Sequence, residues 1–214
     1  GIGSLLTQLA SDVGADLADA FSETVGAGLA AVDLEPRDIE TGHVGNFVGE
    51  LFAGQGQLGG MFAAIDPAFY GMPAGRHEAA CASGSIAMLA ATAELEASRY
   101  DCVIVAGVEL ERNVPGALAA QHLGAATWVG EEAQDAKYAW PHMFDLVGQE
   151  YARRYGLKYE HLGRIAQINI ENARRNPDAQ TRSWEYGPRS FLADDVANPV
   201  IEGMIRRQDC GQVT

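Results

Sequence analysis

The chain has 214 residues, of which 47% are hydrophobic, enough for one large domain, or one domain with a sizeable insertion, around a well-buried core. Its formal net charge of -14 would repel the phosphates of nucleic acids and the surfaces of anionic membranes. We therefore expect neither nucleic acid nor a membrane as a partner.

Three widely spaced cysteines, Cys81, Cys102 and Cys210, predict neither a disulfide framework nor a Cys-x-x-Cys metal site. The histidines have no i, i+4 pairing of the kind that binds zinc, so no metal is expected. We expect reduced thiols and a cytoplasmic location. No apolar run approaches the roughly 20 residues that span a bilayer, and no signal peptide with a basic start is recognised.

The first part of the chain predicts a helix and a strand. Apolar residues recur every three or four positions over Ser4–Ala31, which predicts a helix. The segment Gly42–Glu50 alternates and carries valines, which predicts a short strand. A glycine-rich segment, residues 54–62, leads into a short helix through Ile65.

The next segment predicts a strand, a helix and a second strand. A short strand is expected over Arg76–Ala80 and a helix over Ser85–Arg99, which is rich in good helix formers. The apolar stripe of this helix consists of Ile86, Leu89, Ala93 and Ala97. The continuous apolar run Cys102–Val108 predicts a strand buried on both faces of a parallel sheet. This order predicts a right-handed βαβ unit.

From residue 114 to about residue 192 the composition changes, because this segment holds all three tryptophans and most of the tyrosines and arginines. We interpret 114–192 as an insertion after a core of residues 1–113. Two helices, interrupted near Gly156, are expected over Tyr151–Asn176. Residues 193–214 then return to the core sheet, with Val196–Ile205 as the expected strand.

Two patterns have both a functional and a structural interpretation. Residues 54–59, Gly-Gln-Gly-Gln-Leu-Gly, match the G-x-G-x-x-G fingerprint of dinucleotide binding. They lack the strand directly before and the acid about 20 residues later, so a tight turn and close helix packing are favoured. Basic residues gather between Arg153 and Arg189. Here a solvated helix face is favoured over a site for a phosphorylated small molecule.

Cys81 lies between a predicted strand and a predicted helix, followed by the small residues Ala82, Ser83 and Gly84. A cysteine at a helix N-terminus faces unpaired N–H groups and the positive end of the helix dipole, which lowers the thiol pKa and favours the nucleophilic thiolate. The same N–H groups stabilise the oxyanion that forms when a thiolate attacks a thioester. The alternative is a small core residue, as most isolated cysteines are.

The segment 77–84, His-Glu-Ala-Ala-Cys-Ala-Ser-Gly, resembles the nucleophile motif of thiolases, especially bacterial members similar to the sterol-carrier-protein type. The likeness continues in order over nearly the whole chain. It includes residues 54–64, 101–109, 141–144, 150–157, 172–180 and 209–214.

The resemblance implies the N-terminal half of a five-layered thiolase fold. This half would be an α/β domain with a mixed five-stranded sheet, helices on both faces, and an inserted, mainly helical loop region that covers the CoA and makes oligomer contacts. Cys81 would be the acylated nucleophile, with its own N–H group in an oxyanion hole. His142 and Met143 would lie beside the acyl and pantetheine pocket, with loop packing as the alternative for this pair.

The same resemblance implies acyl-CoA and acetyl-CoA as substrates, no separate cofactor, a role in fatty acid or lipid metabolism, and a homodimer or homotetramer. The family's histidine base, in a Gly-His-Pro motif, and its second reactive cysteine, in a Cys-x-Gly motif, belong to the C-terminal half, which is absent from this sequence. A further segment or a partner chain would supply them. We expect a thiolase-type acyltransferase. The alternatives are a non-catalytic half-thiolase subunit, a thiolase-like aldolase and a nicotinamide-dependent reductase.

Overall fold

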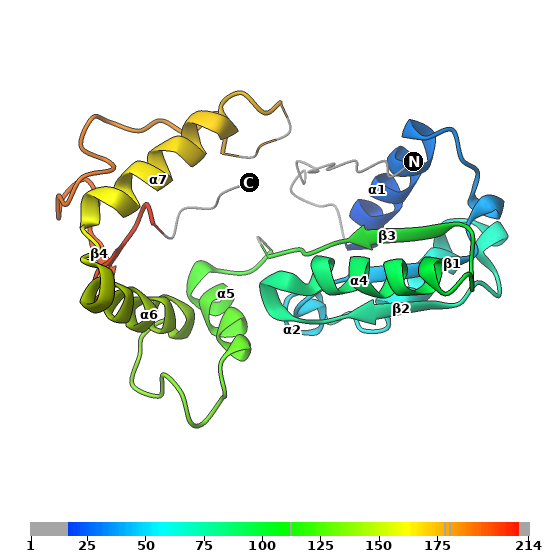
Figure 1. The fold of residues 1–214 in the computed structure, drawn as a ribbon, viewed down its shortest axis with the longest axis horizontal. Coiled ribbons are helices and arrows are strands. Elements are labelled where there is room, and N and C mark those ends of the chain that lie inside the picture. The colour runs from blue at the N-terminus through cyan, green and yellow to red at the C-terminus, as the bar shows by residue number, and fades with distance from the viewer. Residues whose placement is uncertain (1–16, 112, 178, 180, 210–214) are drawn as a thin grey trace. The chain divides into compact units, whose positions relative to one another are not determined.

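The computed structural model describes residues 17–111, 113–177, 179 and 181–209 (Figure 1). Contacts divide the chain into two compact units, residues 1–122 and 123–214, and each unit is described by itself. The boundary expected at residue 113 and the interpretation of 114–192 as an insertion stay predictions. Within the described residues, no helix combines the length and the apolar character needed to cross a membrane.

Unit 1 is built around a parallel sheet. Its elements are α1 (Leu17–Ala31), β1 (Thr41–Gly45), α2 (Gly49–Ala53), α3 (Phe62–Ile65), β2 (Ala74–His77), α4 (Ser83–Glu96), β3 (Val103–Gly107) and most of α5 (Gly116–Leu123), with short 3-10 helices at 36–38, 58–61, 67–69 and 80–82. The strand order is β2-β1-β3, with β1 parallel to both neighbours. The predicted α/β class is therefore confirmed, with three strands of the core sheet among the described residues.

Helices cover both faces of this sheet. Successive residues of a strand face opposite sides, so Gly42 and Gly45 of β1 show what packs on each face. A Cβ atom added to Gly42 would meet the ring of Phe62 in α3 at 2.6 Å. One added to Gly45 would meet the backbone of Gly84 in α4 at 2.7 Å. Figure 1 shows α4 running along the sheet, and the prediction of helices on both faces is confirmed.

The hydrophobic core lies on the face of the sheet opposite α4. The ring of Phe21 in α1 packs edge-on against Phe62 with centroids 5.0 Å apart, and Phe62 packs against Phe69 at 5.6 Å. Val44 of β1 is fully buried in the same cluster. The spacing that predicted the first helix is also the spacing of its buried residues, namely Leu17, Phe21, Val25 and Leu29. The helix is confirmed from residue 17, and residues 4–16 lie outside the described residues.

Two predicted strands are shorter or earlier than expected. β1 ends at Gly45 because the chain turns into α2, where the Asn46 side chain accepts a hydrogen bond from the Gly49 N–H at 3.0 Å. β2 ends at His77, since Ala80 adopts a left-handed conformation with φ 48° that is incompatible with a strand.

The prediction of the buried stripe on α4 was wrong, although the helix itself is confirmed. α4 buries Ser83, Ala87 and Ala91, whereas Ile86 and Leu89 are 40% and 64% exposed. The reason is the short distance between α4 and β1, which admits only small side chains. β3 is likewise confirmed as a strand but not as one buried on both faces, because Val105 is 37% exposed.

Unit 2 is mainly helical. It contains the end of α5, a 3-10 helix at 124–126, α6 (Ala139–Tyr155), α7 (Tyr159–Ala173), β4 (Val200–Glu202) and β5 (Ile205–Arg206). The predicted interruption near Gly156 is confirmed, because Gly156 ends α6 with φ 71°. α6 begins earlier than the expected Tyr151, since Pro141 lies in its first turn, where a helix N–H has no intrahelical partner.

The expected return of Val196–Ile205 to the core sheet is not observed among the described residues. β4 pairs antiparallel with β5 in a separate two-stranded sheet. The turn between them contains Gly203 with φ 47°, and the buried Asp145 of α6 accepts a hydrogen bond from the Met204 N–H at 2.7 Å. The turn and this contact hold the hairpin against α6 and satisfy its backbone locally. The expected closing strand at 210–214 lies outside the described residues.

Candidate active site

Cys81 lies exposed in the 3-10 helix that joins β2 to α4. This exposure contradicts the interpretation of Cys81 as a core residue. No side chain caps the N-terminus of α4, which begins at Ser83. The Ala82 and Ser83 N–H groups bond the Ala79 and Ala80 carbonyls, but the positive end of the α4 dipole can still stabilise a negatively charged atom placed before the helix. A thiolate or an oxyanion at Cys81 is such an atom.

Hydrogen bonds hold the backbone of this turn in a strained conformation. The buried Ser83 Oγ donates to the Ala80 carbonyl at 2.6 Å and accepts from the Ala79 N–H at 3.0 Å. The Ala80 N–H donates to the Glu78 carboxylate at 2.6 Å. Together these bonds fix Ala80 at φ 48°, a conformation that costs a non-glycine residue roughly 1–2 kcal/mol. Such strain clusters at functional sites.

Two glycines define the space around the turn. A Cβ atom on Gly45 would meet the Gly84 N and Cα atoms at 2.8 and 2.7 Å, so the first turn of α4 sits directly on β1. A Cβ atom on Gly84 would meet nothing within 4 Å. The helix N-terminus is therefore fixed against the sheet on one side and open on the other.

Three titratable side chains join the strands to α4. His43 Nδ1 lies 2.7 Å from His77 Nε2, and His43 Nε2 lies 3.0 Å from Glu94 Oε2. Burial lowers the pKa of His77, and the neighbouring His43 lowers it further. This cluster was not predicted from the sequence, because its members share no motif. The only signal was a histidine within each of two strands that turned out to be neighbours.

Cys102 differs from Cys81 in its surroundings. It is half-buried beside the core cluster, next to the first residue of β3. Burial raises the pKa of its thiol, and the charge of Glu40 raises it further. Cys102 is therefore a poorer nucleophile than an exposed thiol. Cys210 lies outside the described residues.

His142 and Met143 lie at the start of α6 in unit 2, in a helix and not in a loop. Both are half-buried, and His142 Nδ1 lies 3.1 Å from Glu202 Oε1 in β4. The structure thus gives His142 a structural partner within unit 2. Because Cys81 belongs to unit 1, a shared site of the three residues stays a prediction.

The glycine pattern at residues 54–59 has the structural role that the sequence favoured. Gly54 ends α2 in the left-handed conformation with φ 66°, and a Cβ atom on Gly59 would meet the Ala74 backbone at 2.9 Å. A helix, α2, also stands between β1 and the glycines, in place of the strand that a dinucleotide site requires. The pattern serves a turn and close packing.

Several of the basic residues of unit 2 form ion pairs on the surface. Arg153 and Arg154 both bond Glu150 at 2.6–2.7 Å, and Arg189 bonds Asp194 at 2.8 Å. These arginine side chains are 57–68% exposed, which agrees with a solvated helix face.

A hollow of about 470 Å³ beside α7 carries both signs of charge. It is lined by Glu160, Arg164, Glu171, Arg174 and Tyr186, among others.

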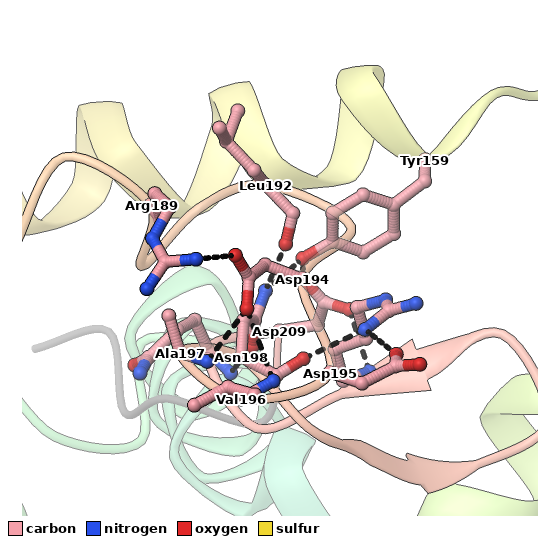
Figure 2. Close-up of polar contacts among 11 residues, drawn as sticks. Tyr159, Arg189, Leu192, Asp194, Asp195, Val196, Ala197, Asn198 and Asp209 are labelled. Atoms are coloured by element: carbon pink, nitrogen blue, oxygen red, sulfur yellow. Dashed lines mark hydrogen bonds and ion pairs between the residues drawn. The ribbon is translucent and has the colours of Figure 1, made fainter.

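A polar network fixes the chain that follows α7 (Figure 2). The fully buried Asn198 donates to the Tyr159 hydroxyl and to the Leu192 carbonyl, and its Oδ1 accepts from the Gln208 N–H at 3.0 Å. The Tyr159 hydroxyl in turn donates to Asp209 Oδ1 at 3.1 Å. Burial is the main reason why the pKa of Tyr159 rises to about 12.

Asp209 makes this network pH-dependent. Burial raises the pKa of its carboxyl, although hydrogen bonds from the Arg206 N–H and the Tyr159 hydroxyl lower it in part. The folded chain therefore binds this proton more tightly than the unfolded chain, and stability falls as the pH rises from the unfolded pKa of about 3.9 through the folded pKa. The variant Asp209→Asn has no carboxyl group at this position, so this fall in stability with rising pH should be absent. In urea unfolding, the free energy of the variant relative to the wild type should rise across that range, and a constant difference would contradict this.

No three His, Cys, Asp or Glu side chains come together as a metal-binding group in the part of the chain that the structure describes. Comparison with known proteins identifies relatives instead. The chain is 29% identical to an acetyl-CoA acetyltransferase of Methanothermobacter thermautotrophicus over 88% of this chain and 48% of that protein. It is 33% identical to an acetyl-CoA acetyltransferase of Methanocaldococcus jannaschii over 73% of this chain and 40% of that protein.

A third relative, the non-specific lipid-transfer protein-like 2 of Caenorhabditis elegans, is 28% identical over 86% of this chain and 44% of that protein. The chain thus spans about half the length of the curated relatives it matches. The model of the family described as the N-terminal domain of thiolase matches residues 2–188, most of the sequence and all of the Cys81 turn. The chain therefore belongs to the thiolase family, as the motif around Cys81 predicted.

Proposed function

We propose that the protein is a thiolase-type acyltransferase, which joins an acyl-CoA and acetyl-CoA into β-ketoacyl-CoA and CoA or catalyses the reverse thiolysis. One observation carries this proposal. In a chain of the thiolase family, an exposed cysteine occupies the strained turn before an uncapped helix N-terminus. The two relatives that are named acetyl-CoA acetyltransferases support the same substrates.

In the first half-reaction, the Cys81 thiolate attacks the thioester carbonyl of an acyl-CoA. The new carbon–sulfur bond to Cys81 forms, the bond to CoA breaks, and CoA leaves as a thiolate that takes up a proton. The tetrahedral oxyanion would be stabilised by the N–H group of Cys81, as the family resemblance implies, and by the positive end of the α4 dipole. The exposed position of Cys81 and the open side of Gly84 leave room for the thioester.

In the second half-reaction, a base removes a proton from the α-carbon of acetyl-CoA. The carbanion attacks the acyl group on Cys81, a carbon–carbon bond forms, and the Cys81 thiolate leaves. The family's histidine base and its second reactive cysteine belong to the C-terminal half, so a further segment or a partner chain would supply the group that removes this proton. CoA thioesters are substrates here, and no separate cofactor takes part.

Further features follow from the family resemblance. His142 and Met143 would contact the acyl and pantetheine part of the substrate. The enzyme would act as a homodimer or homotetramer in the cytoplasm, in fatty acid or lipid metabolism. The contact between His142 and Glu202 would then orient the imidazole, as a carboxylate does for many functional histidines.

The test is the cleavage of acetoacetyl-CoA by the full-length protein in the presence and absence of free CoA. A thiolase requires CoA and forms two molecules of acetyl-CoA for each acetoacetyl-CoA. An aldolase would cleave its own thioester substrate without added CoA. A non-catalytic subunit would not cleave acetoacetyl-CoA either with or without CoA. Cleavage that is independent of CoA, or no cleavage by the full-length protein, would overturn the proposal.

A further inference from the structure

We propose that His43, His77 and Glu94 form a positioning network for the Cys81 turn. The hydrogen bonds of this network are retained when one proton is added, and the bond between the two histidines breaks when a second proton binds. This inference rests on the proposed role of Cys81 as the nucleophile. His43, His77 and Glu94 would touch no substrate. Their role would be to hold the turn in the conformation in which the positive end of the α4 dipole stabilises the Cys81 thiolate.

The network connects the two elements between which Cys81 lies. His77 is the last residue of β2, directly before the turn, and Glu94 belongs to α4, directly after it. His43 in the central strand β1 bonds both of them, at 2.7 Å and 3.0 Å. The His77 carbonyl also accepts a hydrogen bond from the Asn46 N–H at 3.2 Å. The strand before the turn and the helix after it are thus both tied to β1, the helix at a residue near its C-terminal end.

The distances limit how many protons the network can hold. With Glu94 ionised, the His43 Nε2–H donates to the carboxylate, and His43 Nδ1 accepts from the His77 Nε2–H. One added proton is compatible with the network, because His43 can become the cation between Glu94 and His77 and donate to both. A second proton places an N–H on each of the two nitrogens that lie 2.7 Å apart. The bond between the histidines must then break.

The burial of His43 makes its bond to Glu94 important for holding a positive charge. His43 is only 7% exposed, so a cation there depends on Glu94 as its partner. Glu78 directly follows His77 in the chain, and its carboxylate accepts a hydrogen bond from the Ala80 N–H. The 58–61 helix and β3 contain no titratable residue, and Arg76 of β2 pairs with Glu50. Arg99 follows three residues after the end of α4; its bond to the Tyr100 hydroxyl is the main cause of its raised pKa, and the Glu94 carboxylate raises this pKa further.

The test measures how fast iodoacetamide alkylates Cys81 as a function of pH, with peptide mapping to separate Cys81 from the other cysteines. In the wild type, the rate should follow a single thiol ionisation at neutral pH. At acid pH the alkylation rate should fall about fivefold below the curve for a single thiol ionisation, which is the effect of one lost hydrogen bond. The step should lie below the usual histidine pKa of about 6.5, because the first cation opposes the second proton.

Variants separate positioning from a purely structural role. His77→Gln keeps a donor for His43 but does not titrate, so the neutral rate should be retained and the acid step should disappear. His77→Ala should lower the neutral rate by about fivefold, because the hydrogen bond is lost. Glu94→Gln should move the step to lower pH by about one unit, since it keeps an acceptor but removes the charge that stabilises the cation. His161→Gln, at an exposed histidine of unit 2, is the control with the wild-type profile.

A wild-type profile without the acid step, or one that His77→Gln and Glu94→Gln leave unchanged, would overturn the proposal. Circular dichroism at each pH shows whether a variant remains folded. If His77→Ala does not fold, the two conservative variants still decide the question. Alkylation requires neither CoA nor turnover. An acid step in a protein that fails to transfer acyl groups would therefore refute the proposed function and leave the network intact.

Discussion

Cys81→Ala is expected to lower acyl transfer from acetyl-CoA by about a thousandfold or more, because it removes the nucleophile and leaves only binding and the N–H groups. The stability of the protein should hardly change. Cys81 is exposed, and substitutions at exposed positions typically alter the free energy of unfolding by less than about 0.5 kcal/mol. The measurements are steady-state thiolysis by the full-length protein and the midpoint of thermal unfolding.

Cys102→Ala is the matched control. This thiol is half-buried beside the core, and burial raises its pKa, so its removal should leave turnover unchanged at the cost of a small loss of stability. If Cys81→Ala retained turnover while Cys102→Ala lost it, the assignment of the nucleophile would be wrong. Cleavage that persists in both variants without added CoA would favour an aldolase, which does not acylate a cysteine.

Gly45→Ala is expected to damage both the fold and the reactivity of Cys81, although it lies on another strand. The added Cβ atom would meet Gly84 Cα at 2.7 Å and the Ser83 carbonyl carbon at 3.0 Å. These are backbone atoms of the first turn of α4, so the helix N-terminus must move. We expect a loss of about 1–3 kcal/mol, typical of overpacking. A displacement of about 1 Å at the turn would lower acyl transfer by about a hundredfold.

Gly84→Ala tests the same contact from the other side. Its Cβ atom would meet nothing within 4 Å, and alanine is favoured over glycine within a helix by about 1 kcal/mol. The stability of this variant should therefore equal or exceed that of the wild type. Equal losses of stability in Gly45→Ala and Gly84→Ala would contradict the close contact between β1 and α4.

Local patterns in the sequence predicted the elements whose formation depends on local interactions. The spacing of Phe21, Val25 and Leu29 predicted α1 because the same residues face the core. Gly156 ends α6 as expected, since glycine adopts the left-handed conformation without strain. The Cys81 turn was likewise predicted, because its small residues and the following helix formers are contiguous in the sequence.

Features that depend on distant segments were not predicted. The apolar Ile86 and Leu89 suggested the buried face of α4, but the close approach of Gly45 in β1 decides that small residues are buried instead. The β4–β5 hairpin depends on Asp145, far earlier in the chain. The network of His43 with His77 and Glu94 depends on the pairing of two strands and the packing of α4, which no spacing in the sequence reveals.

The central claim is that Cys81 carries the acyl group, and intact and peptide mass spectrometry of the full-length protein tests it most directly. After brief incubation with acetyl-CoA in the absence of a second substrate and acid quenching, we predict one added acetyl group on the peptide that contains Cys81. Free CoA should remove this group, because the acyl-enzyme is a thioester. An unmodified Cys81 peptide, or an acetyl group on another residue that CoA does not remove, would contradict the account.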